Sequence, residues 1–405
     1  MAGSAKKKCF ATVPALRRLD PQTLIDFLMQ FPAYVGGKGL ALPAGPEEDG
    51  TWKLDYELVR DVCMATDVPD DMNTVLFLAS KLGTQKGWEE VQEEAQFRGV
   101  KLDFPRKNLT HYDLAMKAWL QALPDHGDLL EESYARVRIH GKSTYSYYRP
   151  MRDLRKKYRE PTGAVLDGLR LELAEHFVRE ELAREGSVVV KVLVYDYDRE
   201  VWFLVRYPGQ PVRHDAVADD GQDKDVFFTP GEYDAVVYHK RYGDLRLNTN
   251  RKREHAAYRM AFGHALVDSV NAFDPKSAVV TLDPLKGKCR PIFRVDDVPE
   301  LGGIRVHEVS FYCLERPGLR QVWHSDGDDL FTSVGTDGHL LPGGTDTILY
   351  AKFKYRLKDS DKWHSLTVHT GKNLRYERDG DSVVVEQWLR KRGFVADVLG
   401  VHKNG

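Results

Sequence analysis

The sequence is poor in cysteine and has no long apolar run. It contains four cysteines, far apart and without a C-x-x-C pair, namely Cys9, Cys63, Cys289 and Cys313. This spacing excludes the disulfide framework of a small secreted domain and any zinc site that could be recognised from spacing alone. The strongest apolar run, 188–195, contains Lys191 and is far shorter than the ~20 residues that cross a bilayer.

The first residues also lack the features of a signal peptide. Three lysines at 6–8 precede a short apolar stretch, but Pro14 and the pair Arg17-Arg18 interrupt it before it reaches sufficient length. We therefore expect a reduced, cytoplasmic protein that has no membrane partner. Because organelle and nuclear signals are absent too, we expect a bacterial origin.

Net charge is almost absent. Lys and Arg number 59 against 61 Asp and Glu, which gives a formal charge of −2, and hydrophobic residues make up 42%. These values are typical of a globular chain and exclude collagen-like, coiled-coil and wholly disordered proteins. The 405 residues are enough for two or three domains at about 150 residues each.

The common catalytic motifs are missing as well. The sequence has no G-x-x-x-x-G-K-[ST], H-E-x-x-H or G-x-S-x-G, and no G-x-G-x-x-G that opens a helix. The glycine-rich stretch 35–39 follows a predicted helix rather than a strand, which favours a helix-ending turn over a phosphate loop. Asp196 and Asp198 imitate paired metal ligands, but they fit a hairpin turn better.

The hydrophobic periodicity predicts an α+β protein. Apolar residues recur at helical spacing after Asp20-Pro21, a capping signal, and further helices are predicted at 55–66, 71–82, 87–98 and 110–122. From Val188 the period changes to that of strands, with β-rich segments at 188–207, 226–228, 233–240, 244–248, 304–315, 346–356 and 363–370. Helices are expected at 163–185, 251–268 and 382–392, and an exposed acidic loop at 211–225.

Four segments follow from this pattern. We predict a helical bundle over 1–135 and a basic, Tyr-rich connecting segment over 136–162. Beyond them we predict an α+β domain with a helix and a β-hairpin over 163–275. A β-rich domain that ends in a helix occupies 276–405. The C-terminal half is expected to be mainly antiparallel, with two inserted or flanking helices, because helices come first and strands afterwards.

The connecting segment combines cations with aromatic rings. Nine Lys or Arg stand against the single acid Asp153 between positions 136 and 159, with tyrosines interleaved. Cations that meet phosphates and rings that stack on bases favour nucleic-acid recognition. An acidic protein surface and a solvated linker are the alternatives. The candidate contact residues are Arg149, Arg152, Arg155, Lys156, Lys157, Tyr145 and Tyr148.

A second basic group is predicted at the start of the helix 251–268. Arg251, Lys252 and Arg253 would occupy its first turn, with Asn250 as the cap. Cations there oppose the helix dipole, and a bound anion would relieve the conflict. The anion could be a phosphate or the acidic loop 211–225 of the same chain, and we favour the loop.

One sequence cluster could hold a metal or perform acid–base chemistry. An imidazole and three carboxylates lie within six residues, at His324, Asp326, Asp328 and Asp329. Such groups ligate hard or borderline cations. The alternative is structural, with Asp328 or Asp329 at the N-terminus of a short helix.

We therefore expect a non-catalytic interaction protein without a cofactor. Its helical domain would bind a protein partner, and its basic segments would bind nucleic acid or another anionic surface. A metal-dependent hydrolase or nuclease in the β-rich half, which would need a divalent metal, is the first alternative. A ligand-free subunit of a larger assembly is the second. The sequence does not give the oligomeric state.

Overall fold

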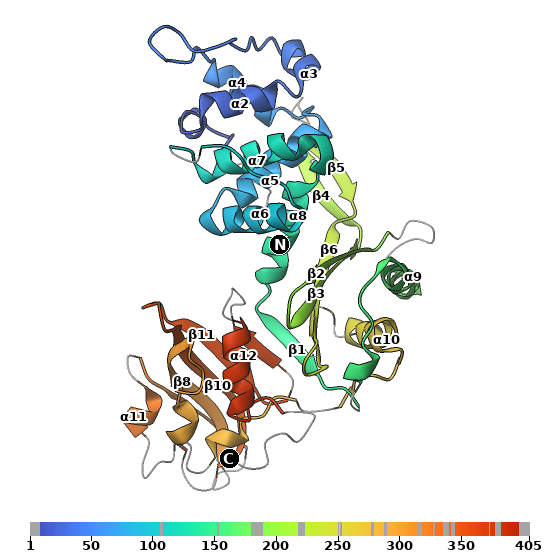
Figure 1. The fold of residues 1–405 in the computed structure, drawn as a ribbon, viewed down its shortest axis with the longest axis vertical. Coiled ribbons are helices and arrows are strands. Elements are labelled where there is room, and N and C mark those ends of the chain that lie inside the picture. The colour runs from blue at the N-terminus through green and yellow to red at the C-terminus, as the bar shows by residue number, and fades with distance from the viewer. Residues whose placement is uncertain are drawn as a thin grey trace. The chain divides into compact units, whose positions relative to one another are not determined.

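The structure is a computed structural model. It describes residues 9–105, 108–151, 154–179, 189–217, 223–249, 251, 253–276, 279–286, 290–313, 318–326, 329–334, 340–341, 345–371, 373–376 and 382–396. The chain divides into two compact units, Met1–Arg138 and Ile139–Gly405 (Figure 1). The predicted limits of the finer segments stay predictions.

The first unit is helical. Its helices are α1 (Val13–Leu16), α2 (Pro21–Leu28), α3 (Pro32–Gly37), α4 (Tyr56–Met64), α5 (Asp70–Leu82), α6 (Gln85–Phe97), α7 (His111–His126) and α8 (Leu129–His140). The helices predicted at 55–66, 71–82, 87–98 and 110–122 correspond to α4 to α7. Among the residues that the structure describes, no helix is long and apolar enough to cross a membrane.

Side-chain caps fix where these helices begin. As the sequence predicts, Asp20 caps α2, since its carboxylate accepts a hydrogen bond from the Thr23 amide at 3.0 Å. Thr110 and Asp113 form a reciprocal capping box at the start of α7. The second oxygen of Asp113 accepts from the Asp20 amide at 2.9 Å, so two helix starts are joined.

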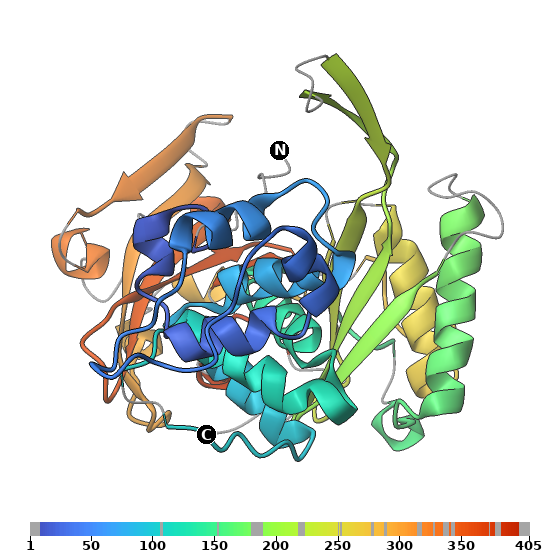
Figure 2. The same ribbon diagram turned by 90° about the horizontal axis from the view of Figure 1, so that it is seen from above.

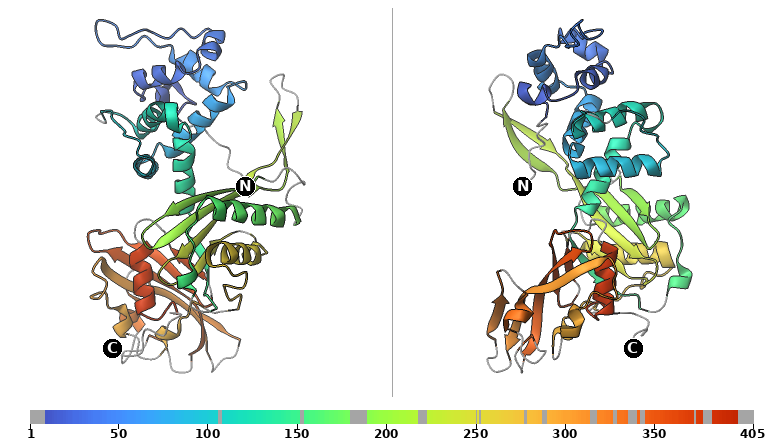
Figure 3. Two further views of the ribbon diagram at one scale, coloured as in Figure 1. Left: turned by 45° about the vertical axis from the view of Figure 1, so that its right-hand side comes forward. Right: turned by 60° about the vertical axis from the view of Figure 1, so that its left-hand side comes forward.

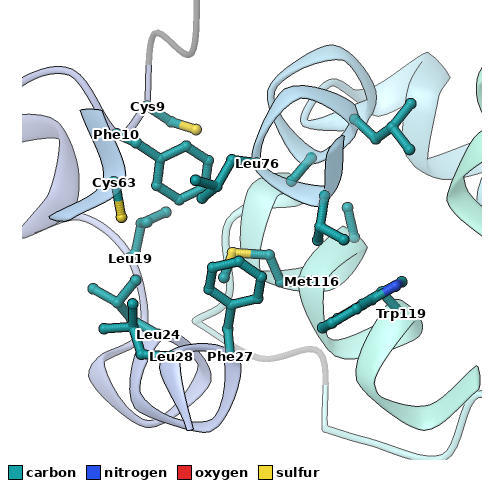
Figure 4. Close-up of a cluster of buried hydrophobic side chains, with 14 of the residues drawn as sticks. Cys9, Phe10, Leu19, Leu24, Phe27, Leu28, Cys63, Leu76, Met116 and Trp119 are labelled. Atoms are coloured by element: carbon teal, nitrogen blue, oxygen red, sulfur yellow. The ribbon is translucent and has the colours of Figure 1, made fainter. Parts of the chain in front are cut away.

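The helical unit encloses its own core. Figure 4 shows Phe10, Phe27, Leu76 and Met116 converging between helices, with Trp119 packed edge-on against Phe27 at 5.7 Å between ring centroids. All these side chains are buried. Apolar burial of this extent is the main source of stability for a helical unit.

The second unit is built on one antiparallel sheet of ten strands. The strand order is β2-β3-β6-β7-β1-β12-β11-β10-β8-β9, and a separate hairpin is formed by β4 and β5. The strands are β1 (Thr144–Tyr148), β2 (Lys191–Asp196), β3 (Glu200–Pro208), β4 (Val212–Val217), β5 (Asp223–Phe228), β6 (Gly231–His239), β7 (Leu245–Asn248), β8 (Leu301–Cys313), β9 (Arg320–His324), β10 (Thr345–Leu357), β11 (His364–His369) and β12 (Asn373–Tyr376).

Different helices pack on the two faces of the sheet. Helices α9 (Gly163–Arg179) and α10 (Glu254–Val267) lie side by side on one face of β2, β3, β6 and β7 and enclose an apolar core (Figure 2). Helix α12 (Ser382–Lys391) packs through Trp388 against Phe353 of β10, on the opposite face. The right-hand view of Figure 3 shows α12 at one side of the strands from β8 to β12.

The fold confirms the α+β class and corrects several local expectations. Residues 211–225 are not simply a loop, because Val212–Val217 and Asp223–Phe228 pair as an antiparallel hairpin that extends beyond the sheet (Figures 2 and 3). Residues 144–148, predicted to belong to a connecting segment, form the strand that joins β7 to β12. Strands β9 and β12 were not predicted at all. Each is short: β9 pairs with the preceding strand β8, and β12 pairs with the preceding strand β11 and with the distant β1.

Candidate nucleic-acid interface

One face of the strands β8 to β12 is lined by polar side chains. From Tyr350 to Arg356 of β10, burial alternates strictly, with Ala351, Phe353 and Tyr355 buried and the intervening side chains partly exposed. Alternation places the two sets on opposite faces, and α12 covers the apolar one. We call the other face the open sheet face. Its side chains include Arg305, His307, Glu308, Ser310, Arg320, the exposed Val322, His324, Tyr350, Lys352, Lys354, Arg356, Thr367, His369 and Arg375, with Trp363 from the β10–β11 turn.

Cross-strand register brings these residues together from distant parts of the sequence. Lys352 is paired with Glu308, Lys354 with Arg305, and Tyr350 with both Ser310 and His369. A register shift between Lys352 and Phe353 leaves His307 as an extra residue in β8. The ring of His307 consequently lies 4.4 Å from that of His324 on β9.

A hydrogen-bond network centred on Glu308 occupies the middle of the open sheet face. Its carboxylate accepts from the Tyr350 hydroxyl at 2.5 Å and from the Lys352 ammonium at 3.0 Å. The imidazole Nδ1 of His324 lies 3.3 Å from Glu308 Oε2. Burial raises the pKa of Glu308, but the hydrogen bonds from Tyr350 and Lys352 outweigh it, and the pKa lies below its ordinary value.

Most cations of this face are not neutralised by carboxylates. Lys352 is paired with Glu308, and Arg356 lies 3.8 Å from the exposed Asp361. In the described part of the chain, no carboxylate lies within ion-pair distance of Arg305, Lys354 or Arg375. Arg320 donates instead to the Ser310 hydroxyl, at 2.8 Å. The face therefore has an excess of positive charge.

Two histidines on this face are held neutral by their surroundings. Burial, followed by the charges of Arg375 and Lys352, lowers the pKa of His369. Burial, followed by Lys354 and His324, lowers the pKa of His307. Both side chains are consequently uncharged near neutral pH and become additional cations on acidification.

Part of the predicted metal cluster lies at the rim of the open sheet face. His324 ends β9, and its Nε2 lies 2.7 Å from the fully exposed Asp326. Asp329 precedes the short helix α11 (Leu330–Val334), and its carboxylate accepts from the Phe331 amide of that helix and from the Val306 amide of β8. Asp328 is outside the described residues. No group of three or more His, Cys, Asp or Glu among the described residues is placed to hold a metal ion.

The connecting segment is divided between core and surface. Tyr145 and Tyr148, the predicted stacking residues, are buried in β1, where Tyr148 packs against Arg259 and contacts His255 Nδ1 at 2.6 Å. Arg149 is half-buried, whereas Lys156 and Lys157 are exposed. Arg155 begins the 3-10 helix η1 (Arg155–Lys157), and Arg152 lies outside the described residues. Their role in anion binding stays a prediction.

The second basic group lies before α10 rather than in its first turn. The helix begins at Glu254, so the predicted start at 251 was wrong. Glu254, fully buried at the first helical position, supplies the negative charge that a helix N-terminus prefers. Arg251 Nη2 lies 3.8 Å from Glu232, and Arg253 Nε lies 3.5 Å from Glu254. Lys252 and Asn250 lie outside the described residues, and an anion partner for this group stays a prediction.

A buried charge cluster holds α12 to the sheet, on the face opposite the open one. It consists of Glu200, Asp244, Arg246, Glu386 and Arg390, all at most 4% exposed. Arg246 Nη1 donates to Glu200 at 2.8 Å, and Arg390 Nη2 donates to Asp244 at 2.8 Å. The hydroxyls of Tyr147 and Tyr376 both donate to Glu386. These contacts hold α12 on one face of the sheet. The opposite face of strands β8 to β12 is therefore the one that α12 leaves uncovered.

The open sheet face was not predicted from the sequence, although part of it could have been. The alternation Tyr350-Ala-Lys-Phe-Lys-Tyr-Arg356 places every cation of that strand on one side, and this pattern is visible without a structure. The contributions of Arg305, Arg320 and Arg375 could not be inferred, because they depend on the pairing of four other strands.

Comparison with known proteins adds no assignment. The chain matches no model of a known protein family, and no curated protein proved similar to it.

Proposed function

We propose that this protein binds nucleic acid through the open sheet face. The observation that carries the proposal is the set of six Lys or Arg side chains facing one way beside aromatic rings: Arg305, Arg320, Lys352, Lys354, Arg356 and Arg375. Clustered cations attract phosphates, and counterions are released on binding. Rings at the same surface can stack on bases.

Two cation–π contacts support a role for this face in ligand binding. Arg320 and Lys352 lie over the ring of Tyr350 at 5.5 and 5.6 Å, so the cations are held by the sheet rather than moving freely. Positioned cations lose less conformational entropy when a ligand binds. The proposal thus keeps the anionic partner expected from the sequence but assigns it to other residues.

The protein partner, the metal-dependent hydrolase and the ligand-free subunit expected from the sequence remain proposals. A protein partner for the helical unit would be sought first around Phe97 and Met29, which are 66% and 59% exposed. The divalent-metal hydrolase and the ligand-free subunit have no contact of their own to favour them. Adding Mg²⁺ or Mn²⁺ to a binding assay would separate a nuclease from a binding protein.

A charge-reversal experiment tests the proposal. The triple variant Arg305→Glu, Lys354→Glu and Arg375→Glu reverses three cations for which the described part of the chain has no carboxylate within ion-pair distance. We expect its affinity for a labelled oligonucleotide, measured by fluorescence anisotropy, to fall by at least about tenfold. The matched control is Arg18→Glu, Lys53→Glu and Lys101→Glu, which makes the same charge change at exposed sites of the helical unit. Equal affinities of the two variants would refute the proposal.

A further inference from the structure

Trp363 has an unusual position for a tryptophan. Of the seven tryptophans in the chain, all of which are described, it is the most exposed, with 36% of its surface accessible, and Trp52 and Trp323 are partly exposed. Tryptophan is a large apolar side chain and is highly buried on average. A partly exposed indole on a cationic surface is therefore a candidate ligand-binding residue.

The indole lies on the open sheet face and not at a distance from it. The guanidinium of Arg305 on β8 lies 4.2 Å from the Trp363 ring, and that of Arg356 on β10 lies at 5.6 Å. Beneath it, β8 has no side chain at Gly303, where a Cβ atom would lie 3.5 Å from Trp363 Cη2. The edge of the ring that carries Cη2 thus lies beside bare backbone, and two arginines contact the indole.

The contacts of Trp363 with Arg305 and Arg356 form a platform that is in place before any ligand binds. Cation–π contacts with two arginines hold the indole, and the guanidinium N–H groups that remain can reach a phosphate. Along β10, outward side chains recur at about 6.8 Å, so Tyr350, Lys352 and Lys354 continue from this platform along the strand. A chain lying along β10 would meet an aromatic ring at each end and cations between them.

We propose that Trp363 stacks on an unpaired base, so that the open sheet face takes a single-stranded nucleic acid rather than a duplex. The inference rests on the proposed function and adds the substrate class to it. In a duplex the faces of the bases are occupied by their neighbours, whereas a single strand can place a base against the indole. Phosphate contacts alone would not distinguish the two forms.

The test compares four ligands with the full-length protein. They are a single strand of mixed sequence as DNA, the same sequence as RNA, the DNA duplex, and the DNA single strand with abasic sites. Wild-type protein is expected to bind both single strands more tightly than the duplex. Trp363→Ala should lose about 5- to 100-fold in affinity for the single strands and little for the duplex. Trp363→Phe should retain part of the affinity, because a smaller ring still stacks.

A cycle between the variant and the abasic ligand isolates the stacking contact. Removal of the bases should weaken binding to wild-type protein and have little further effect on Trp363→Ala. Tryptophan fluorescence provides a second readout, because quenching by the single strand should be lost in Trp363→Phe. Thermal unfolding of both variants checks that the fold is retained.

The outcomes separate this inference from the proposed function. Equal affinity for single strand and duplex, with no effect of Trp363→Ala, would overturn the stacking role and leave nucleic-acid binding intact. Preference for one of the two single strands would identify RNA or DNA as the ligand and would support the inference. No binding of any ligand at low salt would overturn both proposals.

Discussion

Arg246 on β7 and Glu200 on β3 form an ion pair of 2.8 Å in which the arginine has no exposed surface. Arg246 also lies 3.3 Å from Glu386 on α12, so it connects the sheet to that helix. Two guanidiniums oppose three carboxylates in this cluster. Loss of an arginine would leave carboxylates buried without compensation, which is far more costly than loss of an exposed pair.

We expect Arg246→Met to lower the free energy of unfolding of the second unit by about 3–5 kcal/mol. The control is Arg199→Met, which removes a half-exposed arginine that lies 3.9 Å from the exposed Asp198. It should cost less than about 0.5 kcal/mol. Urea denaturation monitored by tryptophan fluorescence compares the two. Equal losses would mean that the cluster does not anchor α12.

The stability of the second unit should depend on pH through His239. Burial, then the charge of Arg246, lowers the pKa of this imidazole from 6.5 to about 4. Its Nδ1 accepts from the amides of Arg241 and Tyr242, so the neutral form is the one that the fold requires. The unfolded chain binds the proton first as pH falls. Stability is therefore complete above pH 6.5 and is lost progressively toward pH 4, by about 3 kcal/mol.

His239→Asn tests this dependence, because an amide oxygen can accept from the same backbone groups but does not titrate. The difference in unfolding free energy between wild type and variant should shrink as pH falls from about 7 to 4.5. Other groups titrate in both proteins and cancel in the difference. A constant difference across that range would contradict the account of His239.

Neutralising Glu308 should strengthen nucleic-acid binding. This carboxylate lies in the centre of the open sheet face, and it holds the Lys352 ammonium at 3.0 Å. In Glu308→Gln, the lysine is released and the local potential becomes more positive. We expect the dissociation constant to fall about threefold at low salt. Glu57→Gln, at an exposed site in the helical unit, should have no effect. Weaker binding by Glu308→Gln would place the carboxylate in contact with the ligand instead.

Acidification should strengthen binding through His307 and His369. Their lowered pKa values keep both neutral near pH 7, and protonation adds positive charge beside Lys354 and Lys352 respectively. Affinity should therefore rise about threefold or more as pH falls below about 6.5, the ordinary pKa of histidine. The double variant His307→Gln and His369→Gln should lose most of this rise. If the variant retains the full pH dependence, another titrating group is responsible.

The sequence was a good guide to local structure and a poor guide to the candidate site. Asp20 and the helices from α4 to α7 were predictable, because caps and apolar periodicity act over a few neighbouring residues. Strand β1 was not, because Tyr145 and Tyr147 pack in a sheet whose neighbouring strands lie about 100 and 230 residues further along the chain. The tyrosines that suggested base stacking there are core residues.

The open sheet face also depends on strand pairing that the sequence does not predict. Lys352 and Lys354 belong to a strand that the sequence predicts, but their neighbours Arg305 and Arg375 come from β8 and β12. Periodicity assigns a side chain to one side of its own strand and does not say which strands lie beside it. Trp363, in a turn, has no periodic pattern from which its position could be inferred.

The most direct test of nucleic-acid binding is the salt dependence of affinity for a single-stranded oligonucleotide. We expect the logarithm of the association constant to fall linearly with the logarithm of salt concentration, with a slope of about −2 to −4 for wild-type protein. The triple variant of Arg305, Lys354 and Arg375 should show a slope shallower by about 2. Absence of binding at low salt, or an identical slope for the variant, would contradict the proposal that this face binds phosphates.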